Sequence, residues 1–332
     1  MKQNTLPIIL SSVALLAGAV AANARDRITV AYFLEWPMPY QFAKAAGTYD
    51  KELGLEVDWV SFESGAAMSA AMASGDVDLS ISQGVPSVVI SNSAGQDLQI
   101  VDVAVSYADN DNCVVQSNLE IDKSNAQELA GKRVAVPLGT VTHYGFLKLM
   151  AHFGVDTETM DIVDMSSTDG SAAFAQGSVD MFCGWGGSLR RASETGQVLL
   201  TGAEKEALGI LVFDATTAPS SFSATEPDLI AKFLKVTADA NAMWSDPANQ
   251  AEMLPVIAKE AGMDQAAAAD TMATFVFPTV DEQLGPIWLG GGIQAYLAGV
   301  AGAFLASGDV AEVLPSYDAS VNSQPLTTAS EM

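Results

Sequence analysis

The hexapeptide ASGDVD at residues 73–78 recurs in closely similar form as AQGSVD at residues 175–180. In both copies a helix-like run ends at a glycine, and an apolar β-type segment follows at once. A glycine at that place is a common helix C-cap, so one copy alone has little weight. The two copies occupy equivalent places in two strand–helix–strand–helix–strand blocks, at 28–82 and 133–184. We therefore expect two equivalent parallel-sheet units.

Strand-like and helix-like segments alternate through both blocks, which predicts an α/β fold. The expected strands span 28–33, 55–62, 77–82, 133–137, 160–165 and 179–184. The expected helices span 41–53, 64–73, 142–153, 170–176, 228–245, 247–262, 265–276 and 291–305. Because so many helices follow the second block, the chain is expected to return and complete the first unit. The predicted division is 25–108 with 215–332 in lobe I and 109–214 in lobe II, with a ligand cleft between the lobes.

The composition indicates an acidic protein with real cores. Hydrophobic residues make up 49% of the 332 residues, which suits about two domains and excludes an intrinsically disordered chain. Lys and Arg number 15 against 40 Asp and Glu, a formal net charge of −25, and such a surface repels nucleic acid and anionic lipid. Two Cys and two His are too few for a Cys/His zinc site or an iron–sulfur cluster, so no metal or cofactor is expected.

Residues 1–24 predict an export signal. Lys2 precedes an apolar stretch over residues 6–22, and the tripeptide ANA at 22–24 fits a signal-peptide cleavage pattern. An N-terminal anchor helix is the alternative, although Pro7 interrupts the stretch near its start. We therefore expect cleavage after residue 24 and localisation in a bacterial periplasm.

The two cysteines lie in strand-like runs, in a compartment that permits disulfides. Cys113 lies in NCVV at 112–115, and Cys183 lies in MFCGW at 181–185. These runs fit two neighbouring strands of one sheet in lobe II. The two thiols either form a disulfide there or remain separate buried side chains.

Several motifs point to a known family. The run GKRVAVP at 131–137 is followed by THY at 142–144, and Asp214 stands thirteen residues before Pro227. These features resemble the nitrate, sulfonate and taurine group of periplasmic substrate-binding proteins of ABC transporters, and the taurine-binding members most of all. The resemblance implies a two-lobed periplasmic binding protein fold of type II. It also implies a small-molecule ligand, a membrane permease as partner and no catalytic activity.

Two strand-to-helix turns are candidates for holding an anionic group. One follows the expected strand at 77–82, and the other opens the expected helix at 142–153. A sulfonate has three acceptor oxygens, and backbone N–H groups at helix N-termini bind such groups well. Ordinary helix capping is the alternative for both turns. The candidate residues are Gln83, Gly84, Val85, Thr140, Thr142 and His143.

The amine end of a zwitterion needs a carboxylate or an aromatic face. Asp214 follows an apolar run near the expected second crossover, and the resemblance supports its role as the carboxylate. Glu35 and Asp111 are candidate helpers. Trp36 and Trp185 are candidate pocket walls, with plain packing as the alternative. The segments around these tryptophans, FLEWP and FCG, depart from the family pattern.

The expected function is that of a periplasmic receptor that captures taurine or a similar small aminosulfonate and delivers it to an ABC permease. One alternative keeps the receptor role but takes another sulfonate, or a quaternary amine inside a cage of Trp36, Trp185 and Tyr107. A second alternative is an enzyme resembling the thiamine-pyrimidine synthases. Those enzymes carry a Cys-rich segment that this chain lacks. We expect no catalytic residue and a monomeric chain.

Overall fold

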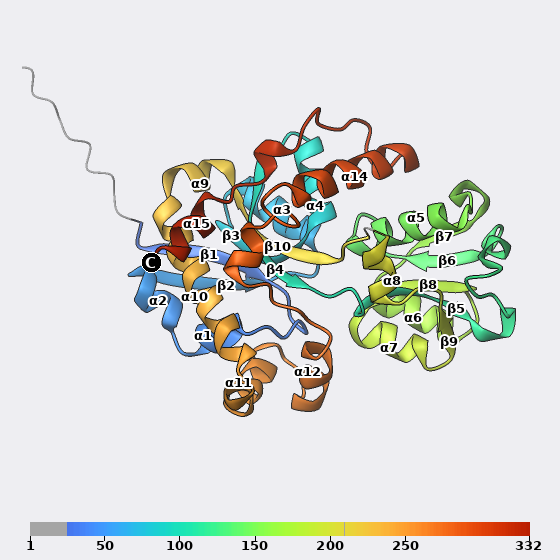
Figure 1. Ribbon diagram of the computed structural model, residues 1–332, viewed down its shortest axis with the longest axis horizontal. Helices are drawn as coiled ribbons and strands as arrows, with labels where there is room; N and C mark the ends of the chain where they lie inside the picture. Colours follow the sequence, from blue (N-terminus) through green and yellow to red (C-terminus); the bar gives the residue numbers. More distant parts are fainter. Residues whose placement is uncertain (1–24, 209) are drawn as a thin grey trace, which may run out of the picture.

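The computed structural model describes residues 25–208 and 210–332. The expected export signal at 1–24 lies outside these residues. Figure 1 shows two α/β units side by side, each built on its own five-stranded sheet. In the described part of the chain, no helix is both long enough and apolar enough to cross a membrane.

The first sheet has the strand order β2-β1-β3-β10-β4. Its strands are β1 (Arg27–Tyr32), β2 (Glu56–Ser61), β3 (Leu79–Gly84), β4 (Leu98–Ser106) and β10 (Phe213–Pro219). β1 runs parallel to β2 and β3, whereas β10 is antiparallel to both β3 and β4. The chain therefore returns to this sheet after it has built the second one.

The second sheet repeats this arrangement in the order β7-β6-β8-β5-β9. Its strands are β5 (Asp111–Gln116), β6 (Arg133–Val136), β7 (Asp161–Asp164), β8 (Met181–Trp185) and β9 (Gly196–Val198). β6 is parallel to β7 and β8, and β5 is antiparallel to β8. The predicted duplicated blocks are confirmed. Each sheet is mixed, however, because an antiparallel strand enters it from the crossover side. The residue-level lobe boundaries stay a prediction.

Helices cover both faces of each sheet. They are α1 (Tyr40–Ala45), α2 (Thr48–Leu53), α3 (Gly65–Ser74), α4 (Val85–Ser93), α5 (Val141–Phe153), α6 (Ser167–Ala175), α7 (Gly186–Ser193), α8 (Gly202–Ala207), α9 (Ser220–Thr225), α10 (Pro227–Ser245), α11 (Pro247–Glu260), α12 (Gln265–Met272), α13 (Val280–Leu284), α14 (Gly292–Ser307) and α15 (Gln324–Ser330). Figure 1 shows α3, α4 and α14 on one side of the first sheet and α1, α2 and α10 on the other. In the second unit α5 lies opposite α6 and α7.

Two expected helices have different bounds. The helix expected at 41–53 is divided into α1 and α2, because Gly47 between them has a left-handed φ of 65°, which a continuous helix does not allow. The helix expected at 265–276 ends at Met272, and the chain then becomes extended, so that Val276 bridges to Ser106 at the end of β4.

A disulfide joins the two central strands of the second sheet. Cys113 of β5 lies directly opposite Cys183 of β8, and their sulfurs are bonded. This confirms the first of the two alternatives for these residues. Successive residues of β5 face opposite ways, as a strand requires. Cys113 and Val115 belong to one buried cluster with α5, and Val114 belongs to another with α6 and α7.

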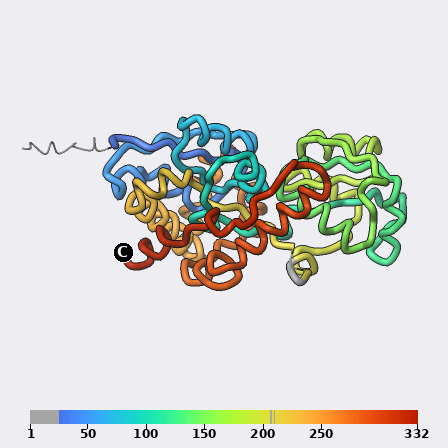
Figure 2. The backbone as a smooth tube through the Cα atoms, turned by 90° about the horizontal axis from the view of Figure 1, so that it is seen from above, coloured from blue at the N-terminus to red at the C-terminus, as the bar shows by residue number. Residues whose placement is uncertain are grey.

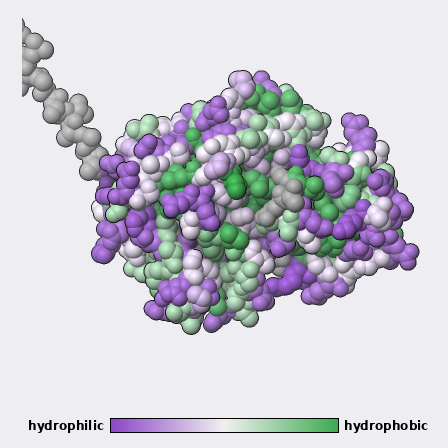
Figure 3. All heavy atoms as spheres, viewed as in Figure 1, coloured by the Kyte–Doolittle hydropathy of each residue, from purple (hydrophilic) through white to green (hydrophobic). Residues whose placement is uncertain are grey.

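Helix α14 connects the two units. It packs against α4 of the first unit and against α5 of the second, and Figure 2 shows it reaching from one to the other. The start of α5 also belongs to the large hydrophobic cluster of the first unit, through Val141 and Tyr144. On the face shown in Figure 3, hydrophilic residues dominate the outer edges and apolar residues gather toward the middle. The junction of the two units is therefore a packed region.

Candidate ligand-binding site

Asp214 is the buried carboxylate around which the candidate site is built. It lies at the start of β10, opposite Gly84 at the end of β3, and is 4% exposed. Its oxygens accept hydrogen bonds from Ser82 Oγ at 3.0 Å and Tyr107 Oη at 2.7 Å. Burial raises the pKa of Asp214 to about 7; the two hydrogen bonds oppose this rise, and the charge of Asp111 adds to it. None of the groups that shift this pKa is basic, so no cation among them balances the charge of the ionised carboxylate.

Trp36 closes one side of this cluster. Its indole Nε1 donates to Ser82 Oγ at 2.8 Å, and Ser82 in turn donates to Asp214. The indole meets the Tyr107 ring edge-on at 5.0 Å between centroids and packs against Phe275 at 4.6 Å. Ser82 has a left-handed φ of 66°, a strained conformation that places its hydroxyl between the two partners. The structure therefore brings Trp36 and Asp214 together through Ser82, and their roles toward a ligand stay a prediction.

The turn from β3 into α4 presents backbone to the same region. Gly84 is the N-cap of α4 and contributes no side-chain cap, and Pro86 follows Val85 in the first turn. A Cβ atom on Gly84 would lie 3.5 Å from Val141 Cγ2 and 3.6 Å from Asp214 Oδ1. Gly84 thus lies between the carboxylate and the start of α5. The predicted carboxylate and the two predicted helix starts are therefore close together in the structure.

The start of α5 supplies the second helix N-terminus. Thr140 is the N-cap, and its Oγ1 accepts a hydrogen bond from the His143 amide at 3.2 Å. The amides of Val141 and Thr142 come first in the helix and have no acceptor within it. With the helix dipole, they form a surface suited to an anionic oxygen. Because a Cβ atom on Gly84 would come within van der Waals distance of Val141, the starts of α4 and α5 lie close together near Asp214.

Asp111 is a second buried carboxylate in this region. It starts β5, opposite Trp185, and its Oδ2 accepts a hydrogen bond from Thr142 Oγ1 at 2.5 Å. The Lys205 ammonium donates to the Asp111 backbone carbonyl. Burial raises the pKa of Asp111 to about 6, while Lys205 and the Thr142 hydrogen bond oppose the rise. Unlike Asp214, Asp111 has a basic neighbour that balances its charge.

His143 turns its imidazole away from Asp214. Its Nδ1 accepts a hydrogen bond from the Gly139 amide at 3.2 Å, and its ring stacks on Phe304 of α14 at 5.3 Å. Nε2 lies 3.9 Å from a carboxylate oxygen of Asp309. Burial lowers the pKa of His143 below its usual value, so the neutral ring serves as the acceptor for Gly139. The side chain positions the turn that opens α5.

Gln83 uses its side chain inside the first unit. Its amide nitrogen donates to the Gly65 carbonyl at 2.7 Å and to Ser69 Oγ at 2.6 Å, and its amide oxygen accepts from Thr217 Oγ1 at 2.5 Å. The side chain thus fastens α3 to the sheet. Of the residues predicted for this turn, Gly84 and Val85 face the candidate site with their backbone, and Gln83 supports them.

Glu35 and Trp185 lie at the margins of the site. Glu35 is exposed in the loop after β1, where its amide donates to the Ala261 carbonyl at 2.7 Å. In the described ranges its carboxylate joins no hydrogen bond or ion pair, so its role as a helper stays a prediction. Trp185 ends β8 and caps α7, its amide donates to Ser167 Oγ at 3.1 Å, and its ring packs against the cluster of the first unit.

Two residues that sequence reasoning missed have buried polar atoms without a partner. Among the described residues, neither Tyr296 Oη nor Asn110 Nδ2 has a hydrogen-bond partner. The Tyr296 ring lies 5.1 Å from Phe213 and 5.2 Å from Tyr144, and Asn110 directly precedes Asp111. No local signal marks Tyr296, because it lies within the apolar helix α14, far along the chain from Asp214.

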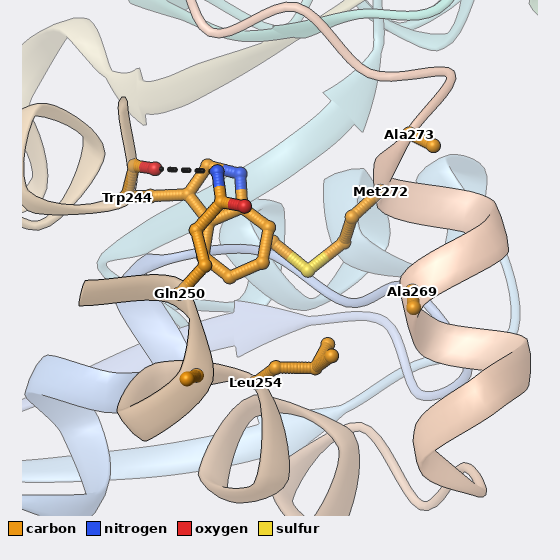
Figure 4. Close-up of a pocket in the computed structure, with 7 residues that line it drawn as sticks. Trp244, Gln250, Leu254, Ala269, Met272 and Ala273 are labelled. Atoms are coloured by element: carbon orange, nitrogen blue, oxygen red, sulfur yellow. Dashed lines mark hydrogen bonds between the residues drawn. The ribbon is translucent and has the colours of Figure 1, made fainter. Parts of the chain in front are cut away.

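One hollow in the described surface lies elsewhere, between α11, α12 and the end of α10 (Figure 4). It has a volume of about 270 Å³, and its polar contact is the Gln250 amide, which donates to the Trp244 carbonyl at 2.9 Å. Its lining is otherwise apolar and includes no predicted site residue: Trp244, Gln250, Ala251, Leu254, Ala269, Met272 and Ala273. A charged ligand has no partner there. Across the described ranges, no three metal-ligating side chains gather at one point.

Comparison with known proteins gives consistent results at three levels. A family described as NMT1/THI5 like matches residues 38–251, more than half of the chain. The chain is 29% identical over 238 residues to the taurine-binding periplasmic protein of Escherichia coli K12, covering 72% of this chain and 71% of that protein. It is 26% identical over 245 residues to a putative aliphatic sulfonates-binding protein of Bacillus subtilis 168, covering 70% and 71% of the two chains.

Solved structures show the fold. The periplasmic aliphatic sulphonate binding protein SsuA of Escherichia coli matches with a TM-score of 0.73 at 20% identity, over 88% of this chain and 90% of that chain. The two sheets, with their shared strand order and two crossovers, therefore form the two-lobed fold of periplasmic binding proteins, as the sequence predicted.

Proposed function

The chain belongs to the NMT1/THI5-like family, and on that premise we propose that it is a periplasmic receptor for taurine or a similar small aminosulfonate. It delivers this ligand to the permease of an ABC transporter and catalyses no reaction. The proposal includes export by cleavage after residue 24, action as a monomer, and closure of lobe I (25–108 and 215–332) against lobe II (109–214). Its relatives include a taurine-binding periplasmic protein and a putative aliphatic sulfonates-binding protein, which supports the ligand class.

One observation carries the ligand assignment: Asp214 is buried opposite Gly84, the N-cap of α4, and has no basic neighbour among the groups that shift its pKa. A buried carboxylate without a cation is costly, and the amine of a zwitterion removes that cost by pairing with it. A plain alkanesulfonate brings a second negative charge and no such pairing. The surroundings of Asp214 therefore favour a ligand with an ammonium close to its anionic group.

The anionic end of the ligand fits the facing starts of α4 and α5. In this proposal the first amides of α4, at Val85, and of α5, at Val141 and Thr142, donate to sulfonate oxygens. The ammonium pairs with Asp214, beside Trp36 and Tyr107. Because taurine has two carbon atoms between its charged groups, its poles suit sites that are adjacent. The distances of 3.5 Å to Val141 Cγ2 and 3.6 Å to Asp214 Oδ1 from a Cβ atom placed on Gly84 support this arrangement.

Thermal unfolding of the purified protein with a panel of ligands tests this proposal. Taurine should raise the melting temperature most, ethanesulfonate less, and choline, betaine and nitrate little, because at equal concentration a ligand that binds more tightly stabilises the folded state more. The largest shift with choline or betaine would favour the quaternary-amine receptor instead. No shift with any sulfonate would refute the proposed ligand class. Mass spectrometry of the ligand released from freshly purified protein provides an independent check.

A further inference from the structure

Tyr296 has a buried hydroxyl without a hydrogen-bond partner in the described part of the chain, at the junction of the two lobes. The residue is 6% exposed, and its Oη has no hydrogen-bond partner among the described residues. Buried tyrosine hydroxyls normally have a partner, because leaving such a group unpaired costs free energy. The other buried atoms in this state within the described ranges are Gln96 Oε1, Asn110 Nδ2, Ser223 Oγ, Asn241 Oδ1 and Gln294 Oε1. The lack of a partner does not by itself distinguish Tyr296 from these atoms. What distinguishes Tyr296 is its position.

That position is beside the candidate site. The Tyr296 ring contacts Phe213, the residue before Asp214, at 5.1 Å between centroids. On its other side it meets the edge of Tyr144, in the first turns of α5, at 5.2 Å. α14, which carries Tyr296, also packs against α4. The ring is thus held by β10 and α5, and its helix packs against α4; these three elements surround the proposed ligand.

The charge around the hydroxyl is negative. Burial raises the pKa of the Tyr296 phenol well above its usual value, and the negative charges of Asp111 and Asp214 raise it further. The phenol is therefore neutral, and its oxygen lies in a region where two carboxylates attract a cation. A neutral phenol oxygen in such a place is a good acceptor for an N–H group of that cation.

We propose that Tyr296 is a specificity-determining residue of the receptor, whose hydroxyl oxygen accepts a hydrogen bond from the ligand ammonium that pairs with Asp214. This inference rests on the proposed function and deepens it. A primary ammonium has three N–H donors and can bond to Asp214 and Tyr296 at once. A trimethylated nitrogen has no N–H donor, so it keeps its charge but can form neither hydrogen bond. The site therefore selects primary aminosulfonates over sulfonates without an amine and over quaternary amines.

Titration calorimetry on the full mature chain tests the role of Tyr296. The wild type, Tyr296→Phe and Tyr144→Phe are each titrated with taurine, N,N,N-trimethyltaurine and ethanesulfonate. In Tyr296→Phe the Kd for taurine should rise about tenfold, the effect expected for one hydrogen bond to a charged group. The Kd values for ethanesulfonate and trimethyltaurine should change less than about twofold. Tyr144→Phe, which removes a neighbouring hydroxyl from the same ring pair, should bind taurine as the wild type does.

The melting temperature of the ligand-free variants separates a binding role from a structural one. Removing a buried hydroxyl that has no partner should leave the melting temperature of Tyr296→Phe unchanged or higher. A lower melting temperature together with equal losses for all ligands would show a packing role and overturn the inference. Unchanged taurine affinity in Tyr296→Phe would overturn it as well, while leaving the proposed function intact. A wild type that binds neither taurine nor ethanesulfonate would refute both.

Discussion

Asp214 of the first sheet and Asp111 of the second occupy equivalent positions in the two halves of the molecule. Each lies at the start of the antiparallel strand that enters its sheet from a crossover. Each faces the last residue of the third parallel strand, Gly84 or Trp185, which is also the N-cap of the next helix. The fold therefore delivers one buried carboxylate from each half to the junction between the lobes.

The two carboxylates differ in what balances their charge. Asp111 has Lys205 close by and a hydrogen bond from Thr142, and its pKa is raised to about 6. Asp214 has only hydroxyl donors, and its pKa is raised further, to about 7. The same position thus serves two purposes. In the second sheet, the carboxylate Asp111 is balanced by Lys205 of the same chain. In the first sheet, Asp214 has no such cation and can pair with one that the ligand brings.

The largest expected effect concerns the disulfide, which only the second sheet possesses. The bond between Cys113 and Cys183 closes a loop with a sequence separation of 70. In the chain-entropy model a loop of that size stabilises the folded state by about 4 kcal/mol. Urea unfolding should therefore show a loss of that order in the double variant Cys113→Ala/Cys183→Ala. The same midpoint in both proteins, or two free thiols in the denatured, unreduced wild type, would contradict the assignment.

The internal cation of the second sheet should have the next largest effect. Replacing Lys205 with Met leaves Asp111 buried without a neighbouring positive charge, which typically costs about 3 kcal/mol. Adding Asp111→Asn should recover most of that loss, because the uncompensated charge is then gone. Lys235→Met is the matched control: Lys235 forms an exposed pair with Asp239 on α10, and its loss should cost below about 0.5 kcal/mol. Equal effects of both lysines on urea unfolding would show that Asp111 needs no internal cation.

The pH dependence of taurine binding tests whether Asp214 must be ionised to hold the ligand. Below its pKa of about 7, Asp214 is protonated and neutral, and it then cannot pair with an ammonium. Taurine affinity should therefore fall as the pH falls, with the Kd rising about thirtyfold between pH 8 and pH 5.5. The affinity for ethanesulfonate should not decrease over this range. In Asp214→Asn the decrease for taurine should disappear. A taurine affinity that is flat in the wild type would exclude Asp214 as the partner of the ammonium.

The sequence predicts the architecture well because the architecture is local and repeated. The repeated hexapeptide at 73–78 and 175–180 marks two blocks, and those blocks are the parallel parts of the two sheets. The antiparallel strands β5 and β10 carry no such mark. Their places depend on crossovers between distant parts of the chain, which local patterns do not encode.

The candidate site shows the same limit at the level of side chains. Asp214 and Trp36 come together through Ser82. The family resemblance marks Asp214, whereas the segment around Trp36 departs from the family pattern. Gln83 and His143 have the predicted positions, but their side chains face the interior and α14, because orientation depends on register and packing. Tyr296 had no signal at all, because α14 meets the site only in three dimensions.

The assignment of an aminosulfonate ligand rests on Asp214 as the carboxylate that pairs with the ligand amine. Calorimetry on the wild type and Asp214→Asn, each with taurine and ethanesulfonate, tests this in one experiment. Removing the charge that pairs with a buried ammonium costs about 2 kcal/mol or more, so taurine should bind at least about thirtyfold more weakly to the variant. Ethanesulfonate, which has no amine, should not bind more weakly. Unchanged taurine binding, or an equal loss for both ligands, would contradict the account.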